Sequence, residues 1–416
     1  MQRIEADLLI VGTADTIKKG CVVIDGGKIS YAGTVEGSPK PTGSDTTVSV
    51  PVVMPGMWEA HGHFTGLKTA NLDEGLRTSI PVLAGRCVRD AERALAAGFT
   101  SVREVGGFGV HLARLIDEGT VNGPHVYGSG AILSQTGGHG DYHSFPLDFV
   151  VQAAESIGMG ALCDGVPECL KAVRKQLRLD VKVIKICASG GVMSEVDHPV
   201  HQQFSDEEQA AIVQEAARAE RVVAAHCHGK PGIMAALKAG CATIEHGSYL
   251  DEESADLMLR KGAILVPTRF IVERLQKFAK TSGLPEISYR KLVAGSDAHK
   301  QAMRLAVKKG LKVALGTDIF SSGDESVVPW GMNGNELGYL VEAGMTPLQA
   351  IQAATSMGPQ TLGPQAPLSG VLRTGYDADV IALAANPLQD VSVLTGSKNV
   401  THVWKAGKLV KHPSGS

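Results

Sequence analysis

Short apolar runs rich in β-branched residues alternate with longer helical stretches through most of the chain. Apolar side chains recur about every 3.6 residues in an amphipathic helix, whereas a buried strand is a short continuous apolar run. Eight strand-like runs interleaved with helical stretches predict an α/β fold, a (β/α)8 TIM barrel. The predicted strands are the run ending at His63 and then 100–105, 125–130, 181–186, 222–228, 243–246, 263–268 and 311–318. The predicted helices are 79–97, 111–118, 165–178, 206–220, 231–239, 251–261, 288–309, 335–343 and 347–354.

The two ends of the chain have a different pattern, with short β-type runs and tight turns. Asp-Gly-Gly-Lys at 25–28 is a hairpin signal, and a second turn is predicted at 405–408. Neither end supplies enough strands for a stable sheet by itself. We therefore predict that both ends combine in one small β-sandwich. The predicted boundaries are 1–53 for its N-terminal part, 54–366 for the barrel and 367–416 for its C-terminal part.

Composition excludes several classes of protein. The chain of 416 residues is 44% hydrophobic and 20% charged, which is ordinary for a globular protein. A formal net charge of -3 without a basic run argues against nucleic-acid binding, and no apolar run approaches the roughly 20 residues of a membrane span. The seven cysteines form no CxxC pair, so we expect buried, reduced thiols. We expect a cytoplasmic protein, or a secreted one if a signal peptide has been removed.

Candidate chemistry begins at His61-Gly62-His63. Side chains two residues apart on a strand point to the same face, so two imidazoles can reach one metal ion. Such a pair is weak evidence alone, but other candidates stand on or at the ends of later strands. In a TIM barrel the chemistry lies at the C-terminal ends of the strands. Each residue alone has an ordinary structural explanation, but together they predict a metal site. The further candidates are Lys185, His226, His246 and Asp318.

This set of residues resembles the amidohydrolase superfamily, in the branch with two metal ions bridged by a carboxylated lysine. The resemblance implies that His61, His63 and Asp318 hold one divalent ion, expected to be zinc. It implies that His226 and His246 hold the second ion and that N6-carboxylated Lys185 bridges both. Asp318 would also act as general base and acid. The resemblance further implies a homo-oligomer, an octamer in related proteins.

Within the superfamily, several segments resemble the group of ochratoxinase and the Xaa-Pro and Xaa-Arg dipeptidases. Members of that group hydrolyse the amide before a C-terminal amino acid. The resemblance implies a small-molecule substrate, namely ochratoxin A or a related N-acyl amino acid or dipeptide. It also predicts a bulkier residue where Gly62 stands. The segments are SQTGGHGD at 134–141, KICASGGVMS at 185–194, AHCHGK at 225–230, GPQAPL at 363–368 and THVWK at 401–405.

Two more histidines fall inside these segments. His228 lies two residues after His226 and could polarise the scissile carbonyl. His139 lies in the long glycine-rich segment 134–164 and could bind the carbonyl or carboxylate of the substrate. A loop of that length in a compact domain is usually functional. Both histidines are therefore predicted to be substrate-binding, and His228 also catalytic.

Other functions remain open at this point. One is a dipeptidase for Xaa-Arg, Xaa-Lys or Xaa-Pro without activity on ochratoxin. A second is a lactonase or phosphotriesterase, because the same kind of metal centre can also hydrolyse esters. A non-catalytic protein on the same barrel is disfavoured because all six ligand positions are occupied by suitable residues. A mononuclear deaminase is disfavoured because it would not need Lys185.

Overall fold

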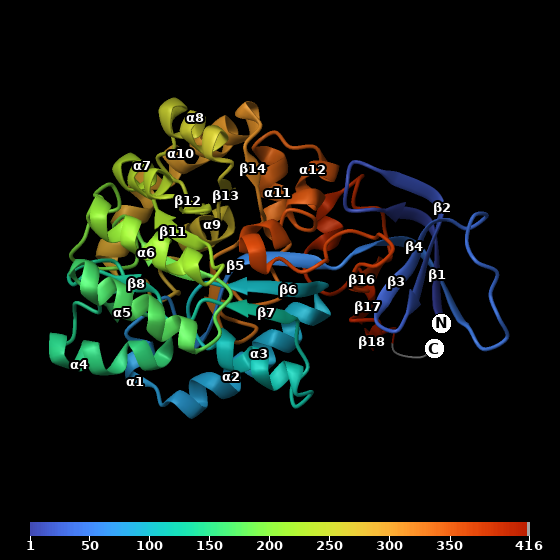
Figure 1. The fold of residues 1–416 in the computed structure, drawn as a ribbon, viewed down its shortest axis with the longest axis horizontal. Helices are drawn as coiled ribbons and strands as arrows, with labels where there is room; N and C mark the ends of the chain where they lie inside the picture. The colour runs from blue at the N-terminus through green and yellow to red at the C-terminus, as the bar shows by residue number, and fades with distance from the viewer. Residues whose placement is uncertain (414–416) are drawn as a thin grey trace.

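Eight strands form a closed barrel in a computed structural model that describes residues 1–413 (Figure 1). Neighbouring strands within each of the two barrel sheets are parallel. Two hydrogen bonds close the remaining gaps, from Lys182 N–H to the Gly128 carbonyl (2.9 Å) and from Ala60 N–H to the Leu315 carbonyl (2.8 Å). The predicted barrel is thus confirmed. Its strands are β5 (Met57–Leu67), β6 (Phe99–Glu104), β7 (His125–Gly128), β10 (Ile184–Cys187), β11 (Val223–Cys227), β12 (Thr243–His246), β13 (Ile264–Val266) and β14 (Lys312–Val313).

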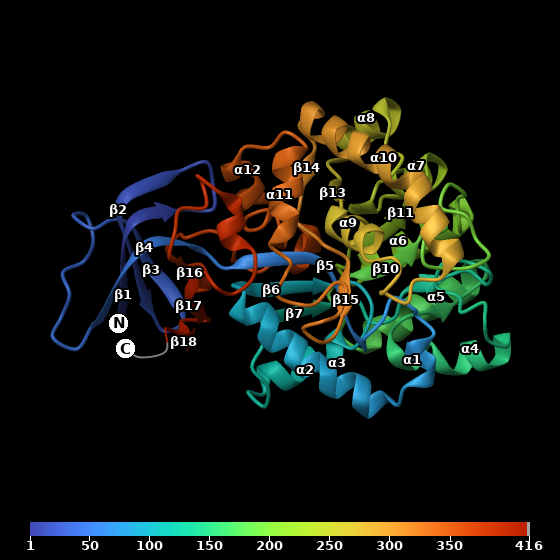
Figure 2. The same cartoon turned by 180° about the vertical axis from the view of Figure 1, so that it is seen from behind.

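Helices surround the barrel, and α2 and α3 pack on the side formed by β5, β6 and β7 (Figure 2). The predicted capping box that opens α6 is present, because Ser205 and Glu208 bond each other's backbone N–H groups. The helices are α1 (Glu74–Arg77), α2 (Ile80–Ala96), α3 (Gly109–Asp117), α4 (Leu147–Ala153), α5 (Gly165–Arg178), α6 (Asp206–Arg218), α7 (Lys230–Ala239), α8 (Glu252–Lys261), α9 (Arg269–Lys277), α10 (Glu286–Lys309), α11 (Asn335–Glu342) and α12 (Pro347–Ala353). Three short 3-10 helices are η1 (Glu155–Ile157), η2 (Pro359–Gln365) and η3 (Val391–Leu394).

The last two barrel strands are shorter than predicted. The seventh ends at Val266, because Pro267 cannot donate to a ladder and Thr268 adopts a left-handed conformation with φ of 56°. The eighth pairs regularly only over β14, since the Leu315 N–H bonds the Ala353 carbonyl instead of a strand. Helix α9 begins after its N-cap residue Thr268, whose side chain makes no capping hydrogen bond.

Both chain ends combine in one seven-stranded sheet beside the barrel, in the order β18-β17-β16-β4-β1-β2-β3. The predicted hairpin is present, with Asp25 paired to Lys28. The sheet curls so that Ala378 N–H bonds the Gly27 carbonyl (3.0 Å) and encloses a core around Trp404. The predicted β-sandwich domain is therefore present, whereas its exact boundaries stay a prediction. Its strands are β1 (Gln2–Ile10), β2 (Thr16–Asp25), β3 (Lys28–Thr34), β4 (Thr46–Pro55), β16 (Val380–Leu383), β17 (Val400–Lys405) and β18 (Lys408–Lys411).

The long segment after the third barrel strand is more regular than its composition suggested. It contains α4, η1 and the short paired strands β8 (Leu133–Ser134) and β9 (Ala161–Leu162). A third short strand, β15 (Ile319–Ser321), pairs with β5 beyond the barrel. All seven cysteines are buried free thiols, as predicted. In residues 1–413 no helix has both the length and the apolar character needed to span a bilayer.

Candidate metal centre

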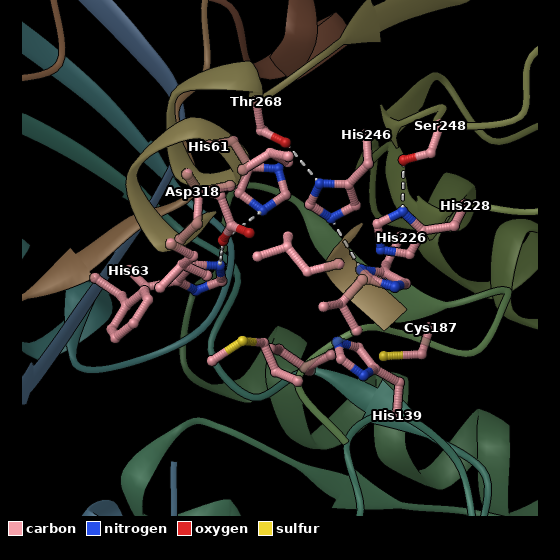
Figure 3. A pocket seen from close by; sticks show the side chains of 18 of the residues that line it. His61, His63, His139, Cys187, His226, His228, His246, Ser248, Thr268 and Asp318 are labelled. Atoms are coloured by element: carbon pink, nitrogen blue, oxygen red, sulfur yellow. Dashed lines mark hydrogen bonds and ion pairs between the residues drawn. The ribbon is translucent and has the colours of Figure 1, made fainter. Parts of the chain in front are cut away.

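The barrel brings the six predicted ligands to one cavity (Figure 3). His61 and His63 lie on β5, His246 ends β12, and Asp318 follows β14. Lys185 and His226 lie on the adjacent strands β10 and β11. The cavity has a volume of about 110 Å³.

Two groups of ligand atoms face this cavity. In the first, Asp318 Oδ1 lies 3.1 Å from His63 Nε2 and 3.5 Å from His61 Nε2. In the second, His226 Nδ1 lies 2.9 Å from His246 Nε2, and His228 is also close. Within each group, one ligand atom per residue lies within 4.8 Å of the others. Each group can therefore hold one metal ion.

Lys185 lines the same cavity and has an unusual environment. Its side chain is 2% exposed, and Nζ has no hydrogen-bond partner in the described part of the chain. Burial lowers the pKa of the amine, which favours its neutral form. A neutral amine is the form that can react with carbon dioxide. A buried, unpaired lysine that lines the same cavity as both groups of histidines fits a group that becomes an anionic ligand.

The ring nitrogens that face away from the cavity are held by hydrogen bonds. His61 Nδ1 lies 2.6 Å from Glu245 Oε2, His63 Nδ1 lies 2.9 Å from the Gly106 carbonyl, and His246 Nδ1 lies 2.7 Å from Thr268 Oγ1. Partners of this kind fix ring orientation and leave Nε2 free for a metal. His226 is the exception, since its Nε2 faces the Gly190 carbonyl (3.3 Å) and its Nδ1 faces the site.

The backbone is strained where the site is built. His246, Thr268 and Asp318 have φ values of 69°, 56° and 57°. The left-handed region is uncommon for residues other than glycine, most of all for β-branched threonine. Such residues cluster at functional sites, where the surrounding structure enforces them. The same strand ends that carry the ligands thus carry the strain.

Close packing explains why glycine stands between His61 and His63. A Cβ at Gly62 would come within 2.6 Å of the Trp330 ring, which stacks on Phe64 with 4.1 Å between centroids. The bulkier residue expected from the family resemblance has no room here. The ligands on either side are unaffected.

A buried ion pair beneath the site was not predicted from sequence. Arg103 on β6 donates to Glu245 Oε1 and Oε2 (both 2.8 Å), and Glu245 in turn holds His61. Burial alone would raise the pKa of Glu245, but Arg103 and His61 hold it well below its usual range. The sequence does show a charged residue, Arg103 or Glu245, inside each of two buried strands. It does not show that these two residues contact each other.

We expect Arg103→Met to destabilise the protein by about 3–5 kcal/mol, because it leaves the Glu245 carboxylate buried without its ion partner. Urea unfolding followed by circular dichroism measures this. Arg114→Met is the matched control, since Arg114 is 82% exposed in an ion pair with Glu118 and should contribute little to stability. Equal midpoints for the two variants would show that the buried pair is not needed.

The other two predicted histidines also line the cavity. His228 Nδ1 lies 2.7 Å from Ser248 Oγ, and burial lowers its pKa to about 3, so the ring is neutral. His139 lies beside Cys187 in Figure 3 and stacks on His226, with 4.2 Å between ring centroids. Both can therefore reach a substrate in the cavity.

Hydrogen bonds fix the tautomer of His139. The buried Asp197 carboxylate can only accept, so the Ser194 hydroxyl in short contact with it must donate. Ser194 Oγ, which lies 2.9 Å from His139 Nδ1, is then an acceptor, and Nδ1 carries the ring proton. Neutral His139 therefore presents an unprotonated Nε2. It can accept from an N–H or O–H group, and it cannot donate to the carbonyl or carboxylate that we expected it to bind.

Apolar side chains form most of the remaining cavity wall. They come from the turn before α1, from α9, α10 and β15, and from the loops between β7 and α6. Among the described residues that line this cavity, Asp318 is the sole acidic one. The apolar lining consists of Leu72, Ile132, Met159, Val192, Met193, Ile271, Val272, Leu275, Leu292 and Phe320.

Known proteins with similar sequences share this architecture. The chain is 46% identical to the ochratoxinase of Aspergillus niger over 424 residues, covering 99% of this chain and 86% of the relative. The crystal structure of that enzyme superposes with a TM-score of 0.93 at 45% identity, covering 99% and 96% of the two chains. A Xaa-Pro dipeptidase with bound methionine has a TM-score of 0.88 at 31% identity, covering 99% of each chain. Residues 52–410 match the amidohydrolase family. The chain therefore belongs to the amidohydrolase family of hydrolases.

Proposed function

We propose that the chain is a binuclear metal hydrolase that cleaves the amide bond of ochratoxin A, releasing phenylalanine and ochratoxin alpha. The observation that carries this is one cavity with a mostly apolar wall that two groups of ligand residues and an unpaired lysine also line. The 46% identity to ochratoxinase across 99% of the chain supports the choice of substrate. Related N-acyl amino acids and dipeptides with apolar C-terminal residues are proposed as further substrates.

The proposed ligands divide between two zinc ions. His61, His63 and Asp318 would hold one ion, and His226 and His246, two of the three histidines in the second group, would hold the other. Lys185, once carboxylated at Nζ, would supply an anionic ligand that offsets part of the cationic charge. When bound, the two ions polarise the scissile carbonyl and acidify water near neutral pH.

The protein's own residues then handle orientation and protons. Asp318 accepts a proton from the attacking water and delivers it to the leaving nitrogen as the C–N bond breaks. His228 donates from Nε2 toward the carbonyl oxygen, where negative charge develops. His139 accepts a hydrogen bond from the substrate at Nε2. The apolar wall excludes water from this exchange.

The cavity lining favours ochratoxin over basic dipeptides. An arginine or lysine side chain of a substrate would need an acidic partner, and in the described lining Asp318 is the sole acid and is assigned to metal. An aromatic ring needs only apolar surface, which the cavity supplies. Cleavage of proline dipeptides stays an alternative because of the 31% identity to a Xaa-Pro dipeptidase. Ester or phosphotriester hydrolysis is the more distant alternative. We also propose a homo-oligomer, an octamer by family resemblance.

Chromatography of metal-loaded protein incubated with ochratoxin A tests the proposal. We expect phenylalanine and ochratoxin alpha in equal amounts, and slower cleavage of dipeptides that end in apolar residues. Discrimination between apolar side chains should be modest, about 10–200-fold, because contacts with an apolar wall differ by only ~1–3 kcal/mol per methylene-sized change. Lysine and arginine dipeptides, proline dipeptides, a lactone and a phosphotriester serve as comparison substrates. The proposal would be wrong if ochratoxin A stays intact while one of these comparison substrates is cleaved rapidly. The activity on that substrate would then be the function of the site.

A further inference from the structure

One buried carboxylate joins several segments of the cavity wall. The Asp197 side chain is 4% exposed and lies in the loop between β10 and α6. Its Oδ2 accepts from the Gly191 N–H (2.8 Å) and from Gln203 Nε2 (3.0 Å). Its Oδ1 accepts from the Ser194 hydroxyl and from Lys291 Nζ (3.3 Å). Four donors are what an ionised carboxylate can accommodate, so both oxygens of Asp197 are fully used.

Two of these donors also hold His139. Ser194 Oγ lies 2.9 Å from His139 Nδ1, and Gln203 Oε1 accepts from the backbone N–H of His139 (3.0 Å). Asp197 therefore bonds both groups that fix this residue, one on its ring and one on its backbone. The ring also packs closely on the neighbouring loop, since a Cβ at Gly191 would come within 2.0 Å of Nδ1.

Lys291 on α10 anchors this arrangement from another part of the chain. Its side chain is 10% exposed, and besides Asp197 it donates to the carbonyls of Ser194 (2.8 Å) and Gly191 (3.2 Å). These contacts use all three donors of the ammonium group. The loop that carries Asp197 is thereby tied to a helix of 24 residues. Asp197 is held in place and so can orient the groups that it bonds.

The chemical consequence lies at His139 Nε2. Because Asp197 takes the Ser194 proton, Nδ1 keeps its own proton and Nε2 is an acceptor. The ring is only half-buried and lines the cavity, so a substrate can reach it. In an N-acyl amino acid, the donor next to the scissile bond is the amide N–H. We propose that Asp197 is a positioning residue that, through Ser194, keeps His139 as the acceptor for this N–H. The proposal rests on the proposed function for the substrate class.

Asp197→Asn changes this polarity with little change in size. If the amide oxygen keeps the bonds to Gly191 and Gln203, the amide NH2 faces Ser194 and donates to it. The Ser194 hydroxyl then donates to His139 Nδ1, and the ring proton moves to Nε2. Exchanging a carboxylate for an amide behind a histidine is known to favour the wrong tautomer in this way. His139 should therefore change from an acceptor into a donor.

A binding experiment on the metal-loaded protein tests this without turnover. N-tosyl-L-phenylalanine has a sulfonamide N–H in place of the amide N–H, and its sulfone analogue has CH2 at that position. Calorimetry gives the two dissociation constants. We expect the sulfonamide to bind about 2–13-fold tighter than the sulfone, the range for a neutral hydrogen bond. In Asp197→Asn this ratio should fall to one or below. A purely structural role would weaken the binding of both ligands and leave the ratio unchanged.

Further variants keep the result interpretable, and thermal unfolding checks that each one folds. Ser194→Ala leaves the other bonds of Asp197 in place and should also lower the ratio. His139→Ala should bring the ratio near one, and adding Asp197→Asn to it should change nothing more. Asp164→Asn is the matched control, because exposed Asp164 bonds Thr136 in the same segment as His139 and should leave the ratio intact.

The proposal is overturned if the ratio survives in folded Asp197→Asn or Ser194→Ala. It is also overturned if the natural protein binds both ligands equally or binds neither. Cleavage of ochratoxin A is assayed separately. An intact toxin with a ratio that depends on Asp197 would overturn the proposed function and support this inference. Cleavage of the toxin with a ratio that does not depend on Asp197 would do the opposite.

Discussion

Asp318→Asn is expected to lower kcat by about 10²–10⁴-fold, or about 3–5 kcal/mol in activation free energy, while the protein stays folded. Asp318 Oδ1 lies between His61 and His63 at the proposed metal site (Figure 3). Burial alone would raise the pKa of Asp318, but the His63 contact and the neighbouring charges lower it. The carboxylate is therefore ionised at neutral pH and can take a proton, which an amide cannot do.

The fold should tolerate this substitution for two reasons. Asparagine is isosteric with aspartate, and it is one of the few residues that tolerate the left-handed backbone that Asp318 adopts. Steady-state kinetics, metal content and thermal unfolding are measured together. Asp324→Asn is the control, because Asp324 is 84% exposed and its pair with Arg93 lies at the surface. A kcat near that of the natural protein, with normal metal content, would refute the assignment of Asp318.

Lys185→Ala is expected to lose bound metal and nearly all activity. The bridging role needs an anionic oxygen ligand, which alanine cannot supply. Lys185→Arg should fail as well, because arginine stays protonated and forms no carbamate. Both variants should therefore lose metal and activity if the carboxylated Lys185 is a metal ligand. Lys185→Arg should keep more activity than Lys185→Ala if the side chain contributes only its volume or its positive charge.

Chemical rescue sharpens this test. Acetate or propionate added to Lys185→Ala supplies a carboxylate that fits the space left by the side chain, and we expect partial return of metal and activity. Lys182→Ala is the matched control, since Lys182 lies near the other end of the same strand, paired with Asp180 near the surface. A fully active Lys185→Arg variant would show that Lys185 is not carboxylated.

The barrel and the positions of the metal-site residues could be predicted because both depend on local sequence. An apolar run that ends in histidine places that side chain at the C-terminal rim, whichever strands lie beside it. His226 and His246 were found in this way, and they lie 2.9 Å apart between facing ring nitrogens. The two chain ends were paired by elimination, because neither could form a stable sheet alone.

The supporting network could not be predicted, because its partners are distant in sequence. Arg103 and Glu245 are 142 residues apart, and His139 and Ser194 are 55 apart. Nothing local in the sequence indicates that these residues meet. The tautomer of His139, and hence the kind of group it can bind, depends on that network. The sequence therefore indicated that His139 faces the substrate but not which hydrogen bond it makes.

Metal analysis of active protein tests whether the proposed site holds two ions. The protein is purified without chelators, and metal per chain is measured by mass spectrometry in parallel with hydrolysis of ochratoxin A. We expect close to two zinc ions per chain, and loss of activity in step with their removal by a chelator. Full activity in protein that holds one ion or none would contradict it.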